Sequence, residues 1–139
     1  MGYVLGIDFD GTCVTHDYPE VGKDIGAAPV LRALRERGHH IILNTMRCGQ
    51  ELEDAKMWFV KNHIELFGAN RNPTQSRWTT SPKVYAHLYI DDAAMGCFLC
   101  YNLELSDRPY VDWKETTNYL HAKGLITYEQ YHEIMKSYE

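Results

Sequence analysis

The sequence has no long hydrophobic run and no excess of basic residues. No apolar stretch approaches the ~18 residues that a membrane span requires. Asp8 and Asp10 interrupt the early hydrophobic run, where a signal peptide would need an unbroken one. Acidic residues outnumber basic ones by 19 to 14, and the resulting net charge of −5 argues against broad nucleic-acid binding. These absences predict a soluble, cytoplasmic protein without membrane contact.

Cysteine is also scarce. The chain has four cysteines, and their spacing does not indicate a disulfide framework. Cys97 and Cys100 form a C-x-x-C pair, but no second pair and no matching histidines stand at zinc-binding spacing. Both intervening residues are apolar, so we expect a buried strand with packed, reduced thiols.

Strand-like and helix-like segments alternate along the chain, which predicts one α/β domain over residues 1–139. Apolar runs bounded by turn residues predict strands at 3–9, 39–45, 64–70, 86–92 and 96–102. Helical spacing and capping patterns predict helices from Pro29 to Gly38, over 50–62, over 81–85, and twice within about 112–138. Because the strands are apolar on both faces, we expect a Rossmann-like, three-layer α/β/α domain with a mainly parallel, five-stranded sheet.

Paired acids follow two of the predicted strands. Asp8 and Asp10 lie two positions apart, so in extended chain their carboxylates are roughly 6.5 Å apart and repel by about 2.5 kcal/mol. Asp91 and Asp92 end the fourth strand, and the carboxyl ends of parallel strands share one edge of a sheet. Carboxylates that converge there need a cation, and their oxygens suit Mg²⁺. A hydroxyl after the second strand and a lysine before the fourth, Thr45 and Lys83, would suit the oxygens of a phosphoryl group.

Four segments in order, "DFDGT", "IILNT", Lys83 and "YIDD", resemble the four-motif pattern of the haloacid dehalogenase-like (HAD) superfamily. The resemblance covers residues 3–95 and implies a phosphatase-type member. The chain lacks room for a large cap domain, since the intervals 13–44 and 46–82 are each already filled by a loop, a helix and at most one strand. The implied activity is Mg²⁺-dependent hydrolysis of a phosphomonoester through an aspartyl-phosphate.

The resemblance also implies a role for each site residue. Asp8 would be the nucleophile, and Asp10 the general acid and then the general base. The implied Mg²⁺ ligands are Asp8, the backbone carbonyl of Asp10, Asp91 and Asp92. The implied substrate-binding residues are Gly11, Thr12, Thr45, Lys83 and, with an ordinary surface arginine as an equal alternative, Arg47.

Other functions stay open at this stage. A non-catalytic phosphate- or Mg²⁺-binding regulatory domain and a phosphomutase fit the same residues. A calcium loop of the EF-hand type does not, because Cys13 and Pro19 replace the required glycine and glutamate. A phospho-receiver domain would carry its acidic pair first and its lysine last, the reverse of the order seen here.

The substrate class is not set by the sequence. Arg71, Arg77 and Trp78 lie in the polar loop that leads to Lys83, and an exposed tryptophan there would suit a base or sugar. His16 and Tyr18 follow Thr12 and are expected at the loop surface. The expected partner is a phosphorylated substrate of unknown class, and a homo-oligomer is possible.

Overall fold

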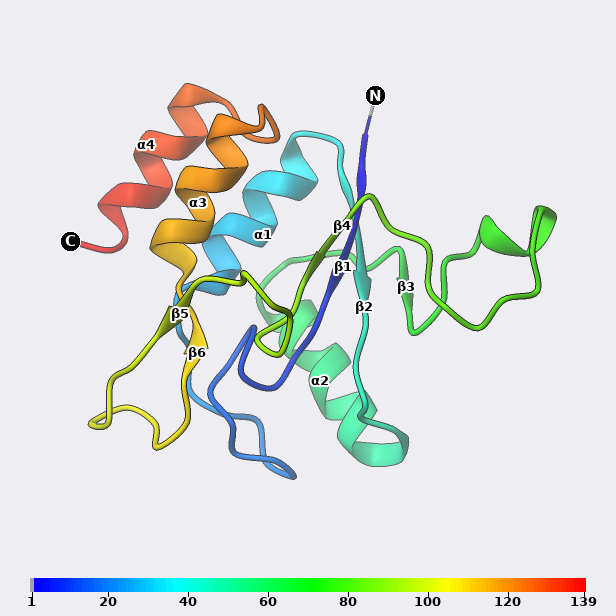
Figure 1. The fold of residues 1–139 in the computed structure, drawn as a ribbon, viewed down its shortest axis with the longest axis horizontal. Helices are drawn as coiled ribbons and strands as arrows, with labels where there is room; N and C mark the ends of the chain where they lie inside the picture. The colour runs from blue at the N-terminus through cyan, green and yellow to red at the C-terminus, as the bar shows by residue number, and fades with distance from the viewer. Residues whose placement is uncertain (1) are drawn as a thin grey trace.

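The computed structural model describes residues 2–139, and its centre is a parallel sheet of four strands in the order β3-β2-β1-β4 (Figure 1). A separate antiparallel pair is formed by β5 and β6. The elements in chain order are β1 Val4–Ile7, α1 Ala27–Glu36, β2 His40–Leu43, α2 Gly49–Lys61, β3 Gly68–Ala69, the 3-10 helix η1 Gln75–Arg77, β4 Leu88–Ile90, β5 Leu99–Cys100, β6 Tyr110–Val111, α3 Trp113–Ala122 and α4 Tyr128–Lys136.

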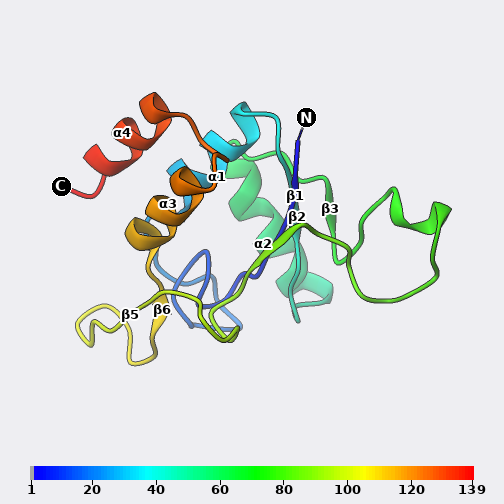
Figure 2. The same cartoon turned by 45° about the horizontal axis from the view of Figure 1, so that its top comes forward.

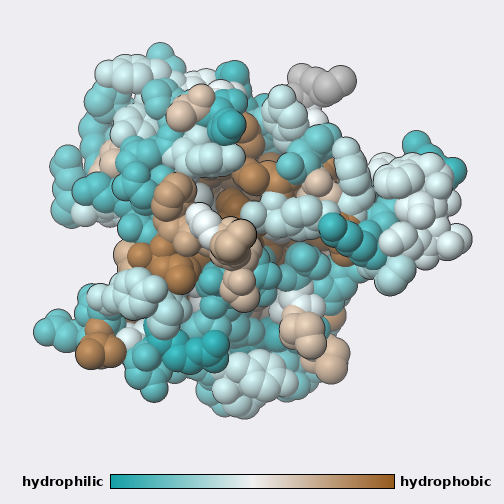
Figure 3. All heavy atoms as spheres, in the orientation of Figure 1, coloured by the Kyte–Doolittle hydropathy of each residue, from teal (hydrophilic) through white to brown (hydrophobic). Residues whose placement is uncertain are grey.

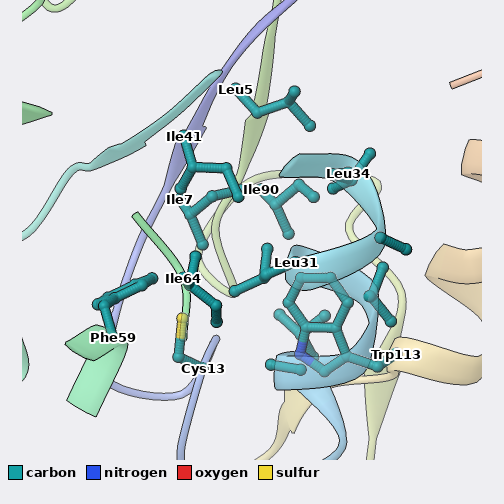
Figure 4. Packing of buried hydrophobic residues seen from close by; sticks show 14 of the residues in the cluster. Leu5, Ile7, Cys13, Leu31, Leu34, Ile41, Phe59, Ile64, Ile90 and Trp113 are labelled. Carbon is teal, nitrogen blue, oxygen red and sulfur yellow. The ribbon is translucent and has the colours of Figure 1, made fainter. Parts of the chain in front are cut away.

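Strand β1 lies at the centre, parallel to both β2 and β4. The connections β1-α1-β2 and β2-α2-β3 step across the sheet in the same direction, so right-handed crossovers place α1 and α2 on the same face. The side chains of Leu5, Ile7 and Ile41 on this face form one buried cluster with residues of α1, α2 and α3 (Figure 4). Turning the molecule shows α1, α3 and α4 side by side (Figure 2).

The opposite face of the sheet differs from the predicted three-layer arrangement. A Cβ added to Gly6 would lie 3.0 Å from the Tyr89 ring and 3.6 Å from the Ala86 methyl group. Val84 and Ala86 are buried, as is Ile42, which points to this face by strand alternation. Within residues 2–139, an extended segment rather than a helix therefore covers this second face.

The predicted five-stranded sheet is also wrong in its last strand. Residues 99–100 do form a strand, β5, but it pairs antiparallel with β6 instead of extending the parallel sheet. The chain makes a turn directly after β4, where Ala94 N–H donates to Asp91 C=O and Cys97 N–H donates to Ala94 C=O. This turn leads the chain away from the β4 edge, and β6 then docks beside the loop after β1 through Val111 N–H to Gly11 C=O, 2.9 Å.

The two C-terminal helices are found where their capping patterns predict them. The Asp112 side chain accepts the Glu115 N–H at the start of α3, and Thr127 forms a complete capping box with Gln130 at the start of α4. Trp113, the first residue of α3, is buried and donates its indole N–H to the Thr12 carbonyl at 2.6 Å. Helix α3 is thus tied to the loop that follows β1.

The short helix predicted over 81–85 is not formed. The buried Gln75 side chain donates to the carbonyls of Ser81 and Lys83 and accepts the Tyr85 N–H, so backbone groups that a helix would pair are already paired. The chain bends at residues 82 and 83 without forming a helix, and the helical turn appears earlier, as η1. In the part of the chain that the structure describes, no helix is long and apolar enough to cross a membrane; the longest, α2, has 13 residues.

Candidate active site

Three carboxylates meet at the carboxyl edge of the parallel sheet. Strands β1 and β4 are neighbours, and Asp8 N–H donates to Ile90 C=O, so the residues that follow the two strands are brought together. Asp8, Asp91 and Asp92 each offer an oxygen, and these oxygens lie within 4.8 Å of one another. All three side chains are half-buried. The convergence of these three predicted ligands is therefore present in the fold.

The charges and the burial of this cluster affect the pKa of Asp8. Burial, and then the charge of Asp91, raise the pKa of Asp8 from 3.8 to about 8, although a hydrogen bond from Thr12 works in the opposite direction. Without a cation, Asp8 at neutral pH is therefore mostly protonated. A bound divalent cation would reverse this effect, because it favours the charged carboxylate.

The donor set fits a small hard cation. Oxygen ligands suit Mg²⁺. The three carboxylates each offer such an oxygen, and these oxygens all lie within 4.8 Å of one another. Asp10 does not join this cluster with its side chain, so its predicted metal role is left to its backbone carbonyl.

Thr12 and Gly11 lie beneath the carboxylates. The buried Thr12 hydroxyl donates to Asp8 Oδ2 at 2.8 Å and accepts the Asp92 N–H at 3.1 Å. Gly11 has φ +81°, and a Cβ there would lie only 2.0 Å from His16 Nε2. Thr12 thus holds two of the acidic residues, and Gly11 makes room for a histidine; the contact of both residues with a substrate stays a prediction.

That histidine is a site residue that the sequence reasoning missed. His16 Nε2 lies 2.8 Å from Asp92 Oδ2, and its side chain is only 14% exposed, so the expectation of a loop-surface residue is wrong. His16 contacts the carboxylate of Asp92, and Thr12 accepts its backbone N–H. Metal-ligating carboxylates are commonly oriented by such hydrogen bonds. The absence of a side chain at Gly11 was the one sequence feature that left space for it.

Arg47 holds Asp10. Its guanidinium donates from Nε and Nη2 to the two oxygens of Asp10, both at 2.8 Å. The remaining N–H groups donate to backbone carbonyls of Pro19, Glu51 and Glu20, so all five are used. The side chain is 1% exposed, and its guanidinium also lies over the rings of Phe9 and Tyr18. The structure thus corrects both expectations for Arg47: it is neither a surface arginine nor free to hold a substrate phosphate.

Thr45 and Lys83 have different surroundings. The Thr45 hydroxyl accepts the Arg47 N–H at 3.1 Å, and the Thr45 N–H donates to the Asn70 side chain at 2.7 Å. Lys83 is exposed, with its Nζ 5.7 Å from the centre of the Tyr89 ring. An open pocket of about 470 Å³, the inner pocket, is lined by Asp91, Lys83, Tyr89, Asn44 and Asn70, among others. Lys83 therefore shares a pocket with one of the acids, and the two asparagines are further pocket residues that the sequence reasoning did not identify.

The raised pKa of Asp8 predicts a stability that depends on pH in metal-free buffer. The folded state keeps a proton on Asp8 up to about pH 8, whereas the unfolded chain loses it near pH 4, so the contribution of Asp8 to stability falls between these values. We expect the free energy of unfolding of the wild type, relative to Asp8→Asn, to fall by roughly 4 kcal/mol between about pH 5 and about pH 8. Urea unfolding in EDTA across this range measures it.

The exposed aspartate Asp107, in the loop between β5 and β6, provides the matched control. Asp107→Asn should follow the wild-type pH profile. Adding Mg²⁺ at pH 8 should stabilise the wild type and leave Asp8→Asn nearly unchanged. Equal pH profiles for the wild type and Asp8→Asn would show that Asp8 is not strained by its neighbours.

Comparison with known proteins gives a structural relative without a stated activity. No family model matches the chain, and no curated protein matches it. A solved structure described as the conserved protein coded by a locus from Bacteroides thetaiotaomicron is similar, with 29% sequence identity and a TM-score of 0.71. The alignment covers 94% of this chain and 97% of that chain. The chain therefore shares an α/β fold with a protein whose description names no substrate or reaction.

Proposed function

We propose that the protein is a Mg²⁺-dependent phosphomonoester hydrolase that acts through an aspartyl-phosphate on Asp8. The observation that carries the proposal is the convergence of Asp8, Asp91 and Asp92, with oxygens within 4.8 Å of one another and the pKa of Asp8 raised to about 8. An arrangement this unfavourable for the empty fold is expected where a cation and a phosphate bind. The motif resemblance adds the order and the roles of the residues.

The carboxylates of Asp8, Asp91 and Asp92, with the backbone carbonyl of Asp10, would hold the Mg²⁺. When bound, the cation offsets the negative charge of the substrate phosphate and of the three acids. His16 and Thr12 keep Asp92 in place for this purpose through the hydrogen bonds described above.

The chemistry on the protein falls into two steps. A carboxylate oxygen of Asp8 attacks phosphorus, the bond from phosphorus to the ester oxygen breaks, and that oxygen leaves with a proton from Asp10. Water then attacks the phosphorus of the aspartyl-phosphate and gives a proton to Asp10. The bond between phosphorus and Asp8 breaks, which releases inorganic phosphate and restores the carboxylate.

Arg47 bears on the second of these steps. It supplies a hydrogen bond to each oxygen of Asp10 and so fixes the position of this carboxylate. In the second step the carboxylate accepts a proton from the attacking water. Each oxygen of Asp10 retains a lone pair that can take up this proton while the arginine holds the side chain in position.

Thr45 and Lys83 would bind the transferring phosphoryl group. The Thr45 hydroxyl is half-exposed at the end of β2, and the Lys83 ammonium lines the inner pocket with Asp91. A hydroxyl and an ammonium pair with the phosphoryl oxygens that Mg²⁺ does not contact. The intervals after β1 and β2 hold no added domain within the described residues, so no such domain covers the pocket.

Removal of the metal tests the proposal. With an aryl phosphate as substrate, the wild type should release inorganic phosphate in Mg²⁺, and EDTA should lower the rate by at least about 100-fold. Refilling with Mg²⁺ should restore the rate, which separates loss of the cation from loss of the fold.

The same assay separates the alternatives. Equal rates in EDTA and in Mg²⁺ would contradict the proposal. Mg²⁺ binding without release of phosphate from any of a panel of phosphorylated metabolites would favour a non-catalytic domain. Transfer of phosphate between two positions of a sugar, without its release, would identify a phosphomutase.

A further inference from the structure

An arm of the chain, residues 70–87, projects from the side of the molecule next to β3 and β4 (Figure 1). It carries Arg71, Arg77 and Lys83, and the sequence from Leu66 to Ile90 contains no aspartate or glutamate. The whole chain has a net charge of −5, so this basic segment is set apart from the rest of the surface. Such a segment attracts an anion rather than a cation.

The arm presents an aromatic surface. Trp78 is 63% exposed, whereas the other two tryptophans, Trp58 and Trp113, are buried in the core. The Tyr85 ring packs against Trp78 in a T-shaped arrangement, with ring centroids 5.5 Å apart. An exposed indole supported by a second ring is a suitable platform for a planar aromatic ligand.

Hydrogen bonds hold the arm in one conformation. The Gln75 side chain joins the two limbs of the arm through the backbone of Ser81, Lys83 and Tyr85, as described above. The Asn72 side chain donates to the Tyr85 carbonyl at 3.0 Å. At the base of the arm, the Tyr89 hydroxyl donates to the Val84 carbonyl. The platform is therefore formed before any ligand binds.

The platform is continuous with the candidate active site. A second pocket of about 340 Å³, the outer pocket, is lined by Trp78 and Tyr85 on the arm. Lys83, Val84 and Tyr89 line both the outer pocket and the inner pocket that contains Asp91. The two pockets therefore adjoin at Lys83, and together they lead from Asp91 to the exposed indole.

Outside the Trp78 and Tyr85 rings, the surface of the arm is polar. Figure 3 shows teal and pale atoms on the projecting arm, while the most hydrophobic atoms lie towards the middle of the same face. A hydrophobic protein partner would require an apolar patch. The combination of basic side chains, an exposed aromatic ring and a polar surface favours a ligand that is both anionic and aromatic.

We infer that the substrate is the phosphomonoester of a nucleoside, either free or at the end of a single strand, with its base on Trp78 and its phosphate at Asp8. The inference rests on the proposed function for the position of the phosphate. The base stacks on the indole in the outer pocket, and Lys83 lies between the base and the reacting phosphate. The interaction with any base is of the same kind, because every base has a flat π face.

Binding to the Asp8→Asn variant tests the inference without turnover. Isothermal titration with adenosine 5′-monophosphate, ribose 5-phosphate and inorganic phosphate compares ligands with and without a base. Adenosine 5′-monophosphate should bind at least about 5-fold more tightly than ribose 5-phosphate, and adding Trp78→Ala should remove this difference, which for one stacked base is about 5- to 150-fold. A short oligoadenylate with the same terminal phosphate then separates a free nucleotide from a strand end. If it binds more tightly than adenosine 5′-monophosphate, the substrate is a strand end; if the two bind equally, it is a free nucleotide.

Tyr101 provides the matched control, because it is 79% exposed in the loop that follows β5. The double variant Asp8→Asn, Tyr101→Ala should bind each ligand with the same affinity as Asp8→Asn alone. Equal affinities for adenosine 5′-monophosphate and ribose 5-phosphate, or an unchanged difference in Trp78→Ala, would overturn the inference. Wild-type hydrolysis of an aryl phosphate would in that case leave the proposed function standing, whereas base-dependent binding without any hydrolysis would uphold the inference alone.

Discussion

Asp8→Asn is expected to lower the rate of phosphate release by at least about 10³-fold while the protein stays folded. An amide oxygen is a poor nucleophile, and replacing a covalent nucleophile removes the pathway through the aspartyl-phosphate. The Thr12 hydroxyl can still donate to the asparagine oxygen, so the local hydrogen bond is kept. In metal-free buffer the variant should even be the more stable of the two at pH 8, because the strained carboxylate is gone.

Steady-state kinetics with an aryl phosphate in saturating Mg²⁺ measure this loss. Asp107→Asn, which removes an exposed charge from another loop, should keep the wild-type rate. If Asp8→Asn kept more than about a tenth of the wild-type rate, Asp8 would not be the nucleophile, whatever the cluster binds. Loss of activity together with loss of the fold, seen as a change in the circular dichroism spectrum, would not count as support.

The features that the sequence predicted correctly are local in the chain. The positions of β1, β2 and β4 follow from short apolar runs, and acids lie directly after β1 and β4. Thr127 and Gln130 are three residues apart, so their capping box can be recognised from a short stretch of sequence. Once the strands were taken as parallel, the meeting of Asp8 with Asp91 followed from the rule that strand ends share an edge.

The features that the sequence did not predict depend on contacts between distant residues. His16 pairs with Asp92 across 76 positions, and no pattern near either residue indicates the pairing. The expected helix at 81–85 did not form because the buried side chain of Gln75 pairs with backbone groups that a helix would use for its own hydrogen bonds. Residues 99–100 had the composition of a strand, but composition does not name the partner of a two-residue strand.

Arg47 is the clearest case of such a contact, and its replacement should have the largest effect on stability. Arg47→Ala removes five hydrogen bonds and leaves the Asp10 carboxylate without its charged partner. Breaking a buried ion pair from one side costs about 3–5 kcal/mol. The carbonyls of Pro19, Glu20 and Glu51 lose donors in the same change, so we expect a loss towards the upper end of this range. Urea unfolding at pH 7 in Mg²⁺ measures it.

Two further variants test whether the effect of Arg47 depends on its burial and on its guanidinium group rather than on its positive charge alone. Lys56→Ala on α2 removes one member of an exposed pair, Lys56 with Glu53 at 3.1 Å, and should cost less than about 1 kcal/mol. Arg47→Lys keeps the charge but cannot donate to both oxygens of Asp10, so its stability should lie between those of the wild type and Arg47→Ala. Its rate of phosphate release should nevertheless fall by at least about 10-fold, since Asp10 must be oriented to transfer a proton. A variant Arg47→Lys with full activity would show that Arg47 stabilises the loop after β1 without positioning Asp10.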